Sequence, residues 1–152
     1  MHKTMKHRLT VLASAMFLFA CGGNSQNAPQ GSSSAEGEKN KSAQIVKDVA
    51  VDEFAQLMQA KSNAIVLDVR TPDEVAAGRV ACGEHIDFYD ANFKARVKTL
   101  DHSAPVFVYC AVGGRSGQAT DFMKREGFTE VYNLDGGMNA WRAAGKPTVN
   151  CD

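Results

Sequence analysis

The segment covering residues 106–116, VFVYCAVGGRS, restricts the fold of this chain more than any other. It opens with an apolar run that favours a β-strand and that ends abruptly at Cys110. Glycines follow, and from Arg115 onward the pattern favours a helix. A thiol between a strand end and a helix start faces unpaired N–H groups and the positive end of the helix dipole, which favour the thiolate. We therefore predict that Cys110 is a reactive cysteine in an anion-binding loop, rather than an inert core cysteine.

Strand and helix patterns alternate along the chain, which is typical of a parallel α/β sheet. We expect strands at residues 44–47, 64–69, 106–109 and 130–134, and helices at residues 51–60 and 115–126. A capping box at residues 71–74 predicts another helix start. Asp90 is expected to cap a helix that carries Phe93, Val97 and Leu100, and a short helix bearing a core tryptophan follows the last strand.

Polar residues follow several of these strands at their carboxyl ends. Asp68 and Arg70 lie at the end of the second strand, Cys110 at the end of the third, and residues 135–137 at the end of the last. Ligands of open α/β sheets bind outside the carboxyl ends of the strands. The topology therefore predicts a binding site at this edge of the sheet.

Short motifs occur along the chain in a definite order. They are Leu67-Asp68-Val69-Arg70-Thr71-Pro72-Asp73-Glu74, Gly78-Arg79-Val80, Ile86-Asp87, Tyr109-Cys110 with Gly113-Gly114-Arg115-Ser116, and Tyr132-Asn133-Leu134-Asp135-Gly136-Gly137 with Trp141. In this order they resemble the rhodanese domain family, and the resemblance runs from about Gln44 to Pro147. It implies a single α/β domain over residues 44–152, with an open, mainly parallel β-sheet and helices on both faces.

The resemblance also implies sulfurtransferase chemistry, with a persulfide intermediate on Cys110. The substrate-binding loop that it implies consists of Ala111, Val112, Gly113, Gly114, Arg115 and Ser116. Arg115 is expected to fix this loop and to steer an anionic donor. Four residues separate Cys110 from Arg115, whereas cysteine phosphatases use five, so the loop length favours sulfur over phosphate.

Asp68 and Arg70 allow two interpretations. The pair could hold the neighbouring catalytic loop or bind the donor. Alternatively, Arg70 forms a structural ion pair with Glu74 or another nearby carboxylate, which is the interpretation that we favour for Arg70. Both residues are therefore predicted to support the site.

Residues 1–20 have the features of a signal peptide, with a basic leader and an apolar run of twelve residues at 9–20. This run is shorter than the roughly 20 residues that a spanning helix needs. The end of the run resembles the lipobox of bacterial lipoproteins, so we predict lipidation at Cys21, with export and anchoring to a bacterial membrane on the periplasmic side. Plain secretion is the alternative. Residues 21–43 are rich in small and polar residues and predict a flexible tether.

Charge and residue spacing limit the partners. The chain has 17 basic and 17 acidic residues, and losing the leader removes only basic ones, so nothing favours nucleic acid. No Cys or His pair has ligand spacing, so we expect no metal and no cofactor. The expected partners are a small sulfur donor, a thiophilic acceptor or a protein thiol, and a membrane through the lipid anchor.

Cys82 and Cys151 remain after Cys21 and Cys110 have been assigned. Disulfides persist in exported proteins, so we hypothesise a Cys82–Cys151 disulfide that holds the C-terminal tail. Two alternatives stay open. In the first, the thiols of Cys82 and Cys151 are both free. In the second, Cys82 reacts with an oxidised Cys110 and so resolves it.

Two function classes fit these observations. The first is an enzyme that moves a sulfane sulfur from a donor such as thiosulfate to a thiophilic acceptor through a Cys110 persulfide. The second is a sulfur carrier or thiol redox relay that acts with a protein partner and does not turn over alone. Both require Cys110, and we predict the enzyme.

Overall fold

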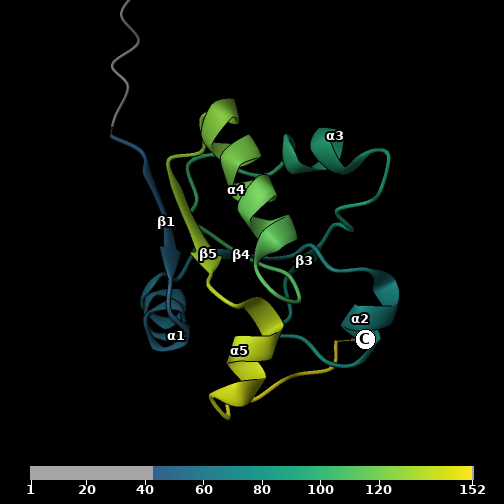
Figure 1. Cartoon of the computed structure of the whole chain (residues 1–152). Coiled ribbons are helices and arrows are strands. Elements are labelled where there is room, and N and C mark those ends of the chain that lie inside the picture. The colour runs from purple at the N-terminus through teal and green to yellow at the C-terminus, as the bar shows by residue number, and fades with distance from the viewer. Residues whose placement is uncertain (1–42, 152) are drawn as a thin grey trace, which may run out of the picture. The chain divides into compact units, whose positions relative to one another are not determined.

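The computed structural model describes residues 43–151. The predicted signal peptide, the lipidation site at Cys21 and the tether as far as residue 42 lie outside the described residues. Strands and helices alternate through the described part of the chain, as the sequence predicts (Figure 1). Over residues 43–151, no helix is both long and apolar enough to cross a bilayer.

Five strands form one sheet in the order β1-β5-β4-β2-β3. Their bounds are Ile45–Val49 (β1), Ile65–Asp68 (β2), Glu84–His85 (β3), Val106–Tyr109 (β4) and Glu130–Leu134 (β5). All four pairings in this sheet are parallel. The strand β4 lies between β5 and β2, and all its residues are buried, which explains its continuous apolar sequence. The predicted parallel sheet is confirmed.

Helices cover both faces of this sheet (Figure 1). Their bounds are Val51–Ala60 (α1), Pro72–Ala76 (α2), Phe93–Val97 (α3), Gly114–Glu126 (α4) and Gly137–Ala143 (α5). One core cluster includes Phe93 of α3 and Phe122 of α4, and the other includes Phe54 of α1 and Trp141 of α5. The prediction of helices on both faces is therefore confirmed, and Trp141 is a core residue.

Two details of the fold differ from the sequence prediction. Helix α3 is shorter than expected, because Leu100 lies after its end and Asn92, rather than Asp90, occupies the N-cap position. Asp90 instead accepts a hydrogen bond from the N–H of Asn92 in a turn before the helix (2.8 Å). After Val97 the N–H of Leu100 bonds the carbonyl of Val97, three residues back (3.2 Å), so the chain turns more tightly than an α-helix. The strand β3 was not predicted, since two residues show no periodicity.

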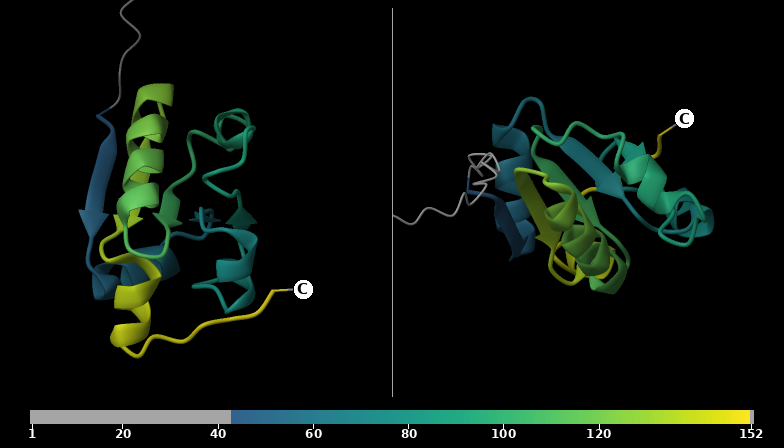
Figure 2. Two further views of the ribbon diagram at one scale, coloured as in Figure 1. Left: turned by 45° about the vertical axis from the view of Figure 1, so that its right-hand side comes forward. Right: turned by 90° about the horizontal axis from the view of Figure 1, so that it is seen from above.

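The C-terminal segment leaves α5 and runs to the chain segment that follows α2 (Figure 2, left). Arg79 and Val149 exchange two backbone hydrogen bonds in an antiparallel bridge, with N–O distances of 2.8 and 2.9 Å. Two residues further along, Cys151 is joined to Cys82 by a disulfide that closes a sequence separation of 69 residues. The structure thus contains the hypothesised pair, and Cys110 is the free cysteine of residues 43–151.

Removing this disulfide is expected to lower the free energy of unfolding by about 2–4 kcal/mol, because the cross-link restricts the unfolded chain. The test is urea unfolding of the Cys82→Ser/Cys151→Ser variant beside the wild type, each with and without reductant. Reductant should destabilise the wild type and leave the double variant unchanged. Equal unfolding midpoints for the oxidised wild type and the variant would contradict the prediction.

Candidate active site

Cys110 directly follows β4 and is fully buried at the base of the loop that leads to α4. The backbone N–H of Gly113 donates to its Sγ at 3.1 Å, and the hydroxyl of Ser116 lies 3.4 Å from the same atom. Gly113 has φ 97°, a left-handed conformation that favours glycine. The sulfur therefore lies where donors from the loop and from the first turn of α4 meet.

These donors change the acidity of the Cys110 thiol. Burial raises its pKa, but the Ser116 hydroxyl and the N–H groups of Ser116, Val112 and Gly113 lower it by more. The pKa of Cys110 therefore lies below the ordinary value for a thiol. Because the thiolate is the nucleophilic form, this environment favours reaction at Cys110.

The start of α5 supports the same loop from the neighbouring strand end. The N–H groups of Met138 and Asn139 donate to the carbonyls of Cys110 and Ala111, at 2.8 and 3.0 Å. Gly137 has φ 57°, and a Cβ at this position would lie 2.5 Å from the carbonyl oxygen of Cys110. Only glycine allows the two backbone segments to approach this closely.

Replacing Gly137 with alanine is therefore expected to lower the free energy of unfolding by about 1–3 kcal/mol through overpacking. Gly145→Ala is the matched control, since Gly145 has a similar φ of 66° and open space where the Cβ would lie. Urea unfolding of both variants checks the prediction. An equal loss of stability in the two variants would show that the contact with the loop contributes nothing.

Arg115 faces a carboxylate that the sequence did not assign to the site. Its Nη1 and Nη2 groups donate to Oε2 and Oε1 of Glu74 at 2.8 and 2.7 Å, and its guanidinium lies 5.6 Å from the ring centre of Tyr89. Glu74 also completes the predicted capping box by accepting hydrogen bonds from Thr71. The capping pattern identified Glu74 as a helix residue, but its ion pair joins segments that are far apart in the sequence.

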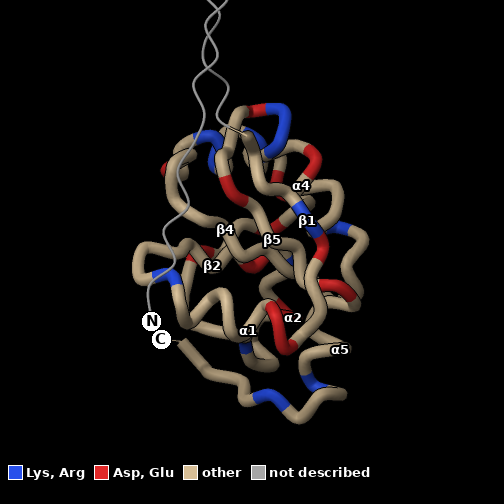
Figure 3. Tube along the Cα trace, turned by 90° about the vertical axis from the view of Figure 1, so that its left-hand side faces the viewer, with Lys and Arg blue, Asp and Glu red and all other residues tan. Residues whose placement is uncertain are grey.

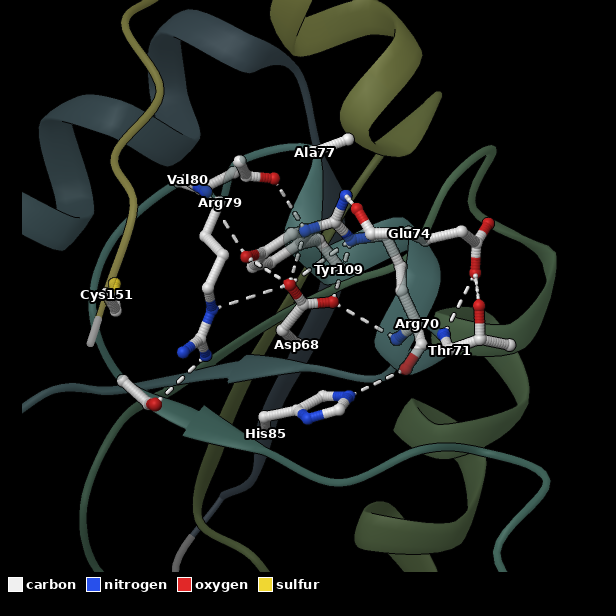
Figure 4. A network of polar contacts seen from close by, with 12 residues as sticks. Asp68, Arg70, Thr71, Glu74, Ala77, Arg79, Val80, His85, Tyr109 and Cys151 are labelled. Atoms are coloured by element: carbon white, nitrogen blue, oxygen red, sulfur yellow. Dashed lines mark hydrogen bonds and ion pairs between the residues drawn. The ribbon is translucent and has the colours of Figure 1, made fainter.

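Asp68 and Arg70 form a buried ion pair at 2.6 Å between Nη2 and Oδ2 (Figure 4). Arg70 therefore forms the structural ion pair that we favoured, and of the two carboxylates that this interpretation allowed its partner is the other nearby one, Asp68, and not Glu74. The Nη1 group of Arg70 instead donates to the backbone carbonyl of Glu74 at 2.8 Å. Asp68 lies in register with Tyr109, the residue before Cys110, so this pair lies beside the strand that carries the thiol.

Two further buried residues complete this polar network and were not predicted to belong to it. The Tyr109 hydroxyl donates to Asp68 at 2.7 Å, and Nε of Arg79 lies 3.7 Å from the same carboxylate (Figure 4). Burial and the neighbouring Asp68 raise the pKa of Tyr109 to about 12, so the hydroxyl keeps its proton and acts as a donor. The sequence singled out Arg79 only as part of the Gly78-Arg79-Val80 motif, and nothing in it indicated a contact with Asp68.

Comparison with known proteins assigns the chain to a family. The profile of the rhodanese-like domain matches residues 50–144, which is more than half of the chain. The chain belongs to the rhodanese-like domain family.

Relatives and solved structures agree with this assignment. The thiosulfate sulfurtransferase GlpE of Pseudomonas putida strain F1 is 36% identical over 92 residues, which cover 60% of this chain and 81% of that protein. The protein of the same name from Pseudomonas aeruginosa strain PAO1 is 37% identical over 90 residues, with coverages of 58% and 79%. A rhodanese-related protein from Thermoplasma volcanium has a TM-score of 0.61 and 26% identity, and covers 69% of this chain and 99% of its own. A rhodanese-like domain from Anabaena has a TM-score of 0.57 and 26% identity, with coverages of 68% and 79%.

Basic and acidic residues are interspersed along the backbone trace of the rhodanese-like domain (Figure 3). Across residues 43–151, no three His, Cys, Asp or Glu side chains are grouped so that they could hold a metal ion.

The lowered pKa of Cys110 gives the rhodanese-like domain a testable pH dependence. The thiolate fraction rises with pH through the pKa, so alkylation by iodoacetamide is expected to reach its half-maximal rate at lower pH in the native protein than in urea. The unfolded chain should show the midpoint of an ordinary thiol, about 8.5. Mass analysis of the Cys110 peptide measures both profiles. A native midpoint at or above the one in urea would contradict the prediction.

Proposed function

We propose that this rhodanese-like domain is a sulfurtransferase that moves a sulfane sulfur from a donor such as thiosulfate to a thiophilic acceptor. The observation that carries the proposal is the position of Cys110 Sγ, which receives hydrogen bonds from Gly113 and Ser116 at the start of α4. The similarity to proteins named thiosulfate sulfurtransferase GlpE supports the same reaction.

The first step is attack of the Cys110 thiolate on the outer sulfur of thiosulfate. A bond forms between the two sulfurs, the sulfur–sulfur bond of thiosulfate breaks, and sulfite leaves with the electron pair. The product is a Cys110 persulfide whose terminal sulfur carries the negative charge. The terminal sulfur is bonded to Sγ, which accepts a hydrogen bond from the Gly113 N–H, so the partial positive charge that favours the thiolate also favours this neighbouring anion.

The second step regenerates the enzyme. A nucleophile such as cyanide or a thiolate attacks the terminal sulfur, the persulfide bond breaks, and Cys110 leaves as a thiolate. Cyanide becomes thiocyanate and a thiolate becomes a persulfide, so each cycle transfers one sulfur atom without an external oxidant. This is covalent catalysis by double displacement. It requires no separate general base, because the groups around Cys110 already favour the thiolate.

Intact mass after thiosulfate treatment tests the proposal. We expect the wild-type chain to gain the mass of one sulfur atom, to carry it on the Cys110 peptide, and to lose it on addition of cyanide with release of thiocyanate. A chain with an alkylatable Cys110 that gains no sulfur from thiosulfate would contradict the proposal. Sulfur gain only in the presence of a protein donor would favour the relay function instead.

We also propose that the protein is exported and lipid-anchored through Cys21. The Cys82–Cys151 disulfide supports an oxidising compartment, because disulfides persist outside the cytosol. Fractionation of cells that express the wild type or Cys21→Ser tests this proposal. The wild type should remain with the membranes, and the variant should not. Equal distribution of both proteins would contradict lipidation at Cys21.

A further inference from the structure

The cation next to Cys110 is already paired with an anion. Both terminal nitrogens of Arg115 bind the two carboxylate oxygens of Glu74, at 2.8 and 2.7 Å. The side chain of Arg115 is 15% exposed and that of Glu74 is 34% exposed, so the pair lies at the boundary between the loop and solvent. Arg115 therefore meets the site as half of a neutral pair, and not as an uncompensated cation.

Glu74 is itself fixed in place, so the ion pair has a defined geometry. Its Oε2 accepts hydrogen bonds from the N–H and the hydroxyl of Thr71 at 2.9 and 3.0 Å, as part of the capping box of α2. The hydrogen bonds from Arg115 lower the pKa of Glu74 to about 2, so the carboxylate is ionised at neutral pH. The negative charge opposite Arg115 is a permanent feature of the site.

Arg115 lies in the chain between Gly113 and Ser116, whose N–H and hydroxyl groups lie 3.1 and 3.4 Å from Sγ of Cys110, so its charge is close to the sulfur. The hydrogen bonds from Arg115 to Glu74 raise the pKa of Arg115 most, and the negative charge of the Cys110 thiolate raises it further. Anything that changes the net charge of the Glu74–Arg115 pair therefore changes the potential that an approaching donor meets. Thiosulfate carries two negative charges, so this potential affects it more than it affects a neutral reagent.

We propose that Glu74 is a positioning residue that sets the charge selectivity of the Cys110 site. By neutralising Arg115, Glu74 lowers the preference of the site for highly anionic sulfur donors and favours donors of lower charge. The inference about donors rests on the proposed sulfurtransferase function, whereas the effect on the electrostatics at Cys110 does not.

Two alkylating reagents of similar size and different charge test this proposal. Iodoacetate is an anion and iodoacetamide is neutral, and both react with the same Cys110 thiolate. Their rate ratio at one pH is therefore independent of the thiolate fraction. We expect Glu74→Gln to raise the iodoacetate-to-iodoacetamide ratio by roughly threefold to tenfold, because Arg115 gains an uncompensated charge. Glutamine keeps the shape of the side chain and one of the two acceptor oxygens, while the other is replaced by an NH2 group.

Variants of Arg115, the partner of Glu74, complete a double-mutant cycle. Arg115→Gln leaves Glu74 unpaired, so the ratio is expected to fall below the wild-type value, and this variant carries the test if Glu74→Gln does not fold. The Glu74→Gln/Arg115→Gln double variant again has no net charge at the pair, so its ratio should return to about the wild-type value. A purely structural role would change both rates together and leave the ratio constant in all four proteins.

Sulfur transfer supplies a second readout on the same proteins. In Glu74→Gln we expect the KM for thiosulfate to fall by roughly threefold to tenfold, with a smaller change in kcat. A changed alkylation ratio without sulfur gain in any variant would overturn the proposed function and leave the role of Glu74 intact. Normal sulfur gain with an unchanged ratio in all variants would overturn the role of Glu74 and leave the function intact.

Discussion

In the Cys110→Ser protein we expect sulfur transfer from thiosulfate to cyanide to fall by about 10⁴-fold or more, as when other covalent enzymes lose their nucleophile. Serine has nearly the same shape as cysteine, and the donors at Gly113 and Ser116 can bind its hydroxyl. The hydroxyl is a weak nucleophile without an adjacent base, and it cannot carry a sulfane sulfur. Thiocyanate formation measures the rate, and urea unfolding shows whether the fold is kept.

Ser116→Ala is the matched control for this prediction. It removes one donor 3.4 Å from the sulfur and keeps the nucleophile, so we expect a loss of about tenfold or less. A Cys110→Ser rate within about tenfold of the wild type would instead place the nucleophile elsewhere in the chain. The order of the two losses therefore separates the residue that carries the sulfur from a residue that stabilises it.

Most elements of the fold could be predicted because each depends on local signals. The apolar run of β4 and the capping box at Thr71 are complete within a few neighbouring residues, and both are present in the structure. The strand β3 has only two residues, and its pairing with β2 depends on contacts across the sheet. The early end of α3 reflects tight turns after Val97, for which the apolar spacing gave no indication.

The candidate site was predictable at Cys110 and less so around it. The thiol and its loop are contiguous in the sequence, so their relation to the helix start is a local property. Glu74 and Arg115 are 41 positions apart in the sequence. Arg70 has two carboxylates nearby in the sequence, Asp68 and Glu74, and the local pattern does not show which of them it binds. Which carboxylate each arginine binds depends on how α2 packs against the loop, and only the structure shows this arrangement.

The buried carboxylate of Asp68 is the basis of the largest expected effect on stability. It accepts hydrogen bonds from the side chains of Arg70 and Tyr109 at 2.6 and 2.7 Å and lies 3.7 Å from Nε of Arg79. Asp68 is 0% exposed, and both arginines are below one tenth exposed. We expect Asp68→Asn to lower the free energy of unfolding by about 3–5 kcal/mol, because it leaves two buried cations without their counter-ion. Urea unfolding at neutral pH measures this loss.

Two further variants distinguish loss of charge from loss of a hydrogen bond. Tyr109→Phe removes one donor to Asp68 and is expected to cost only about 1–2 kcal/mol. Arg79→Met in the Asp68→Asn background removes one uncompensated cation, so the double variant should be more stable than Asp68→Asn alone. A loss in Asp68→Asn no larger than that in Tyr109→Phe would mean that the carboxylate charge is not required. A double variant less stable than Asp68→Asn would mean that Arg79 stabilises the fold mainly through its bonds to the carbonyls of Gly83 and Glu84.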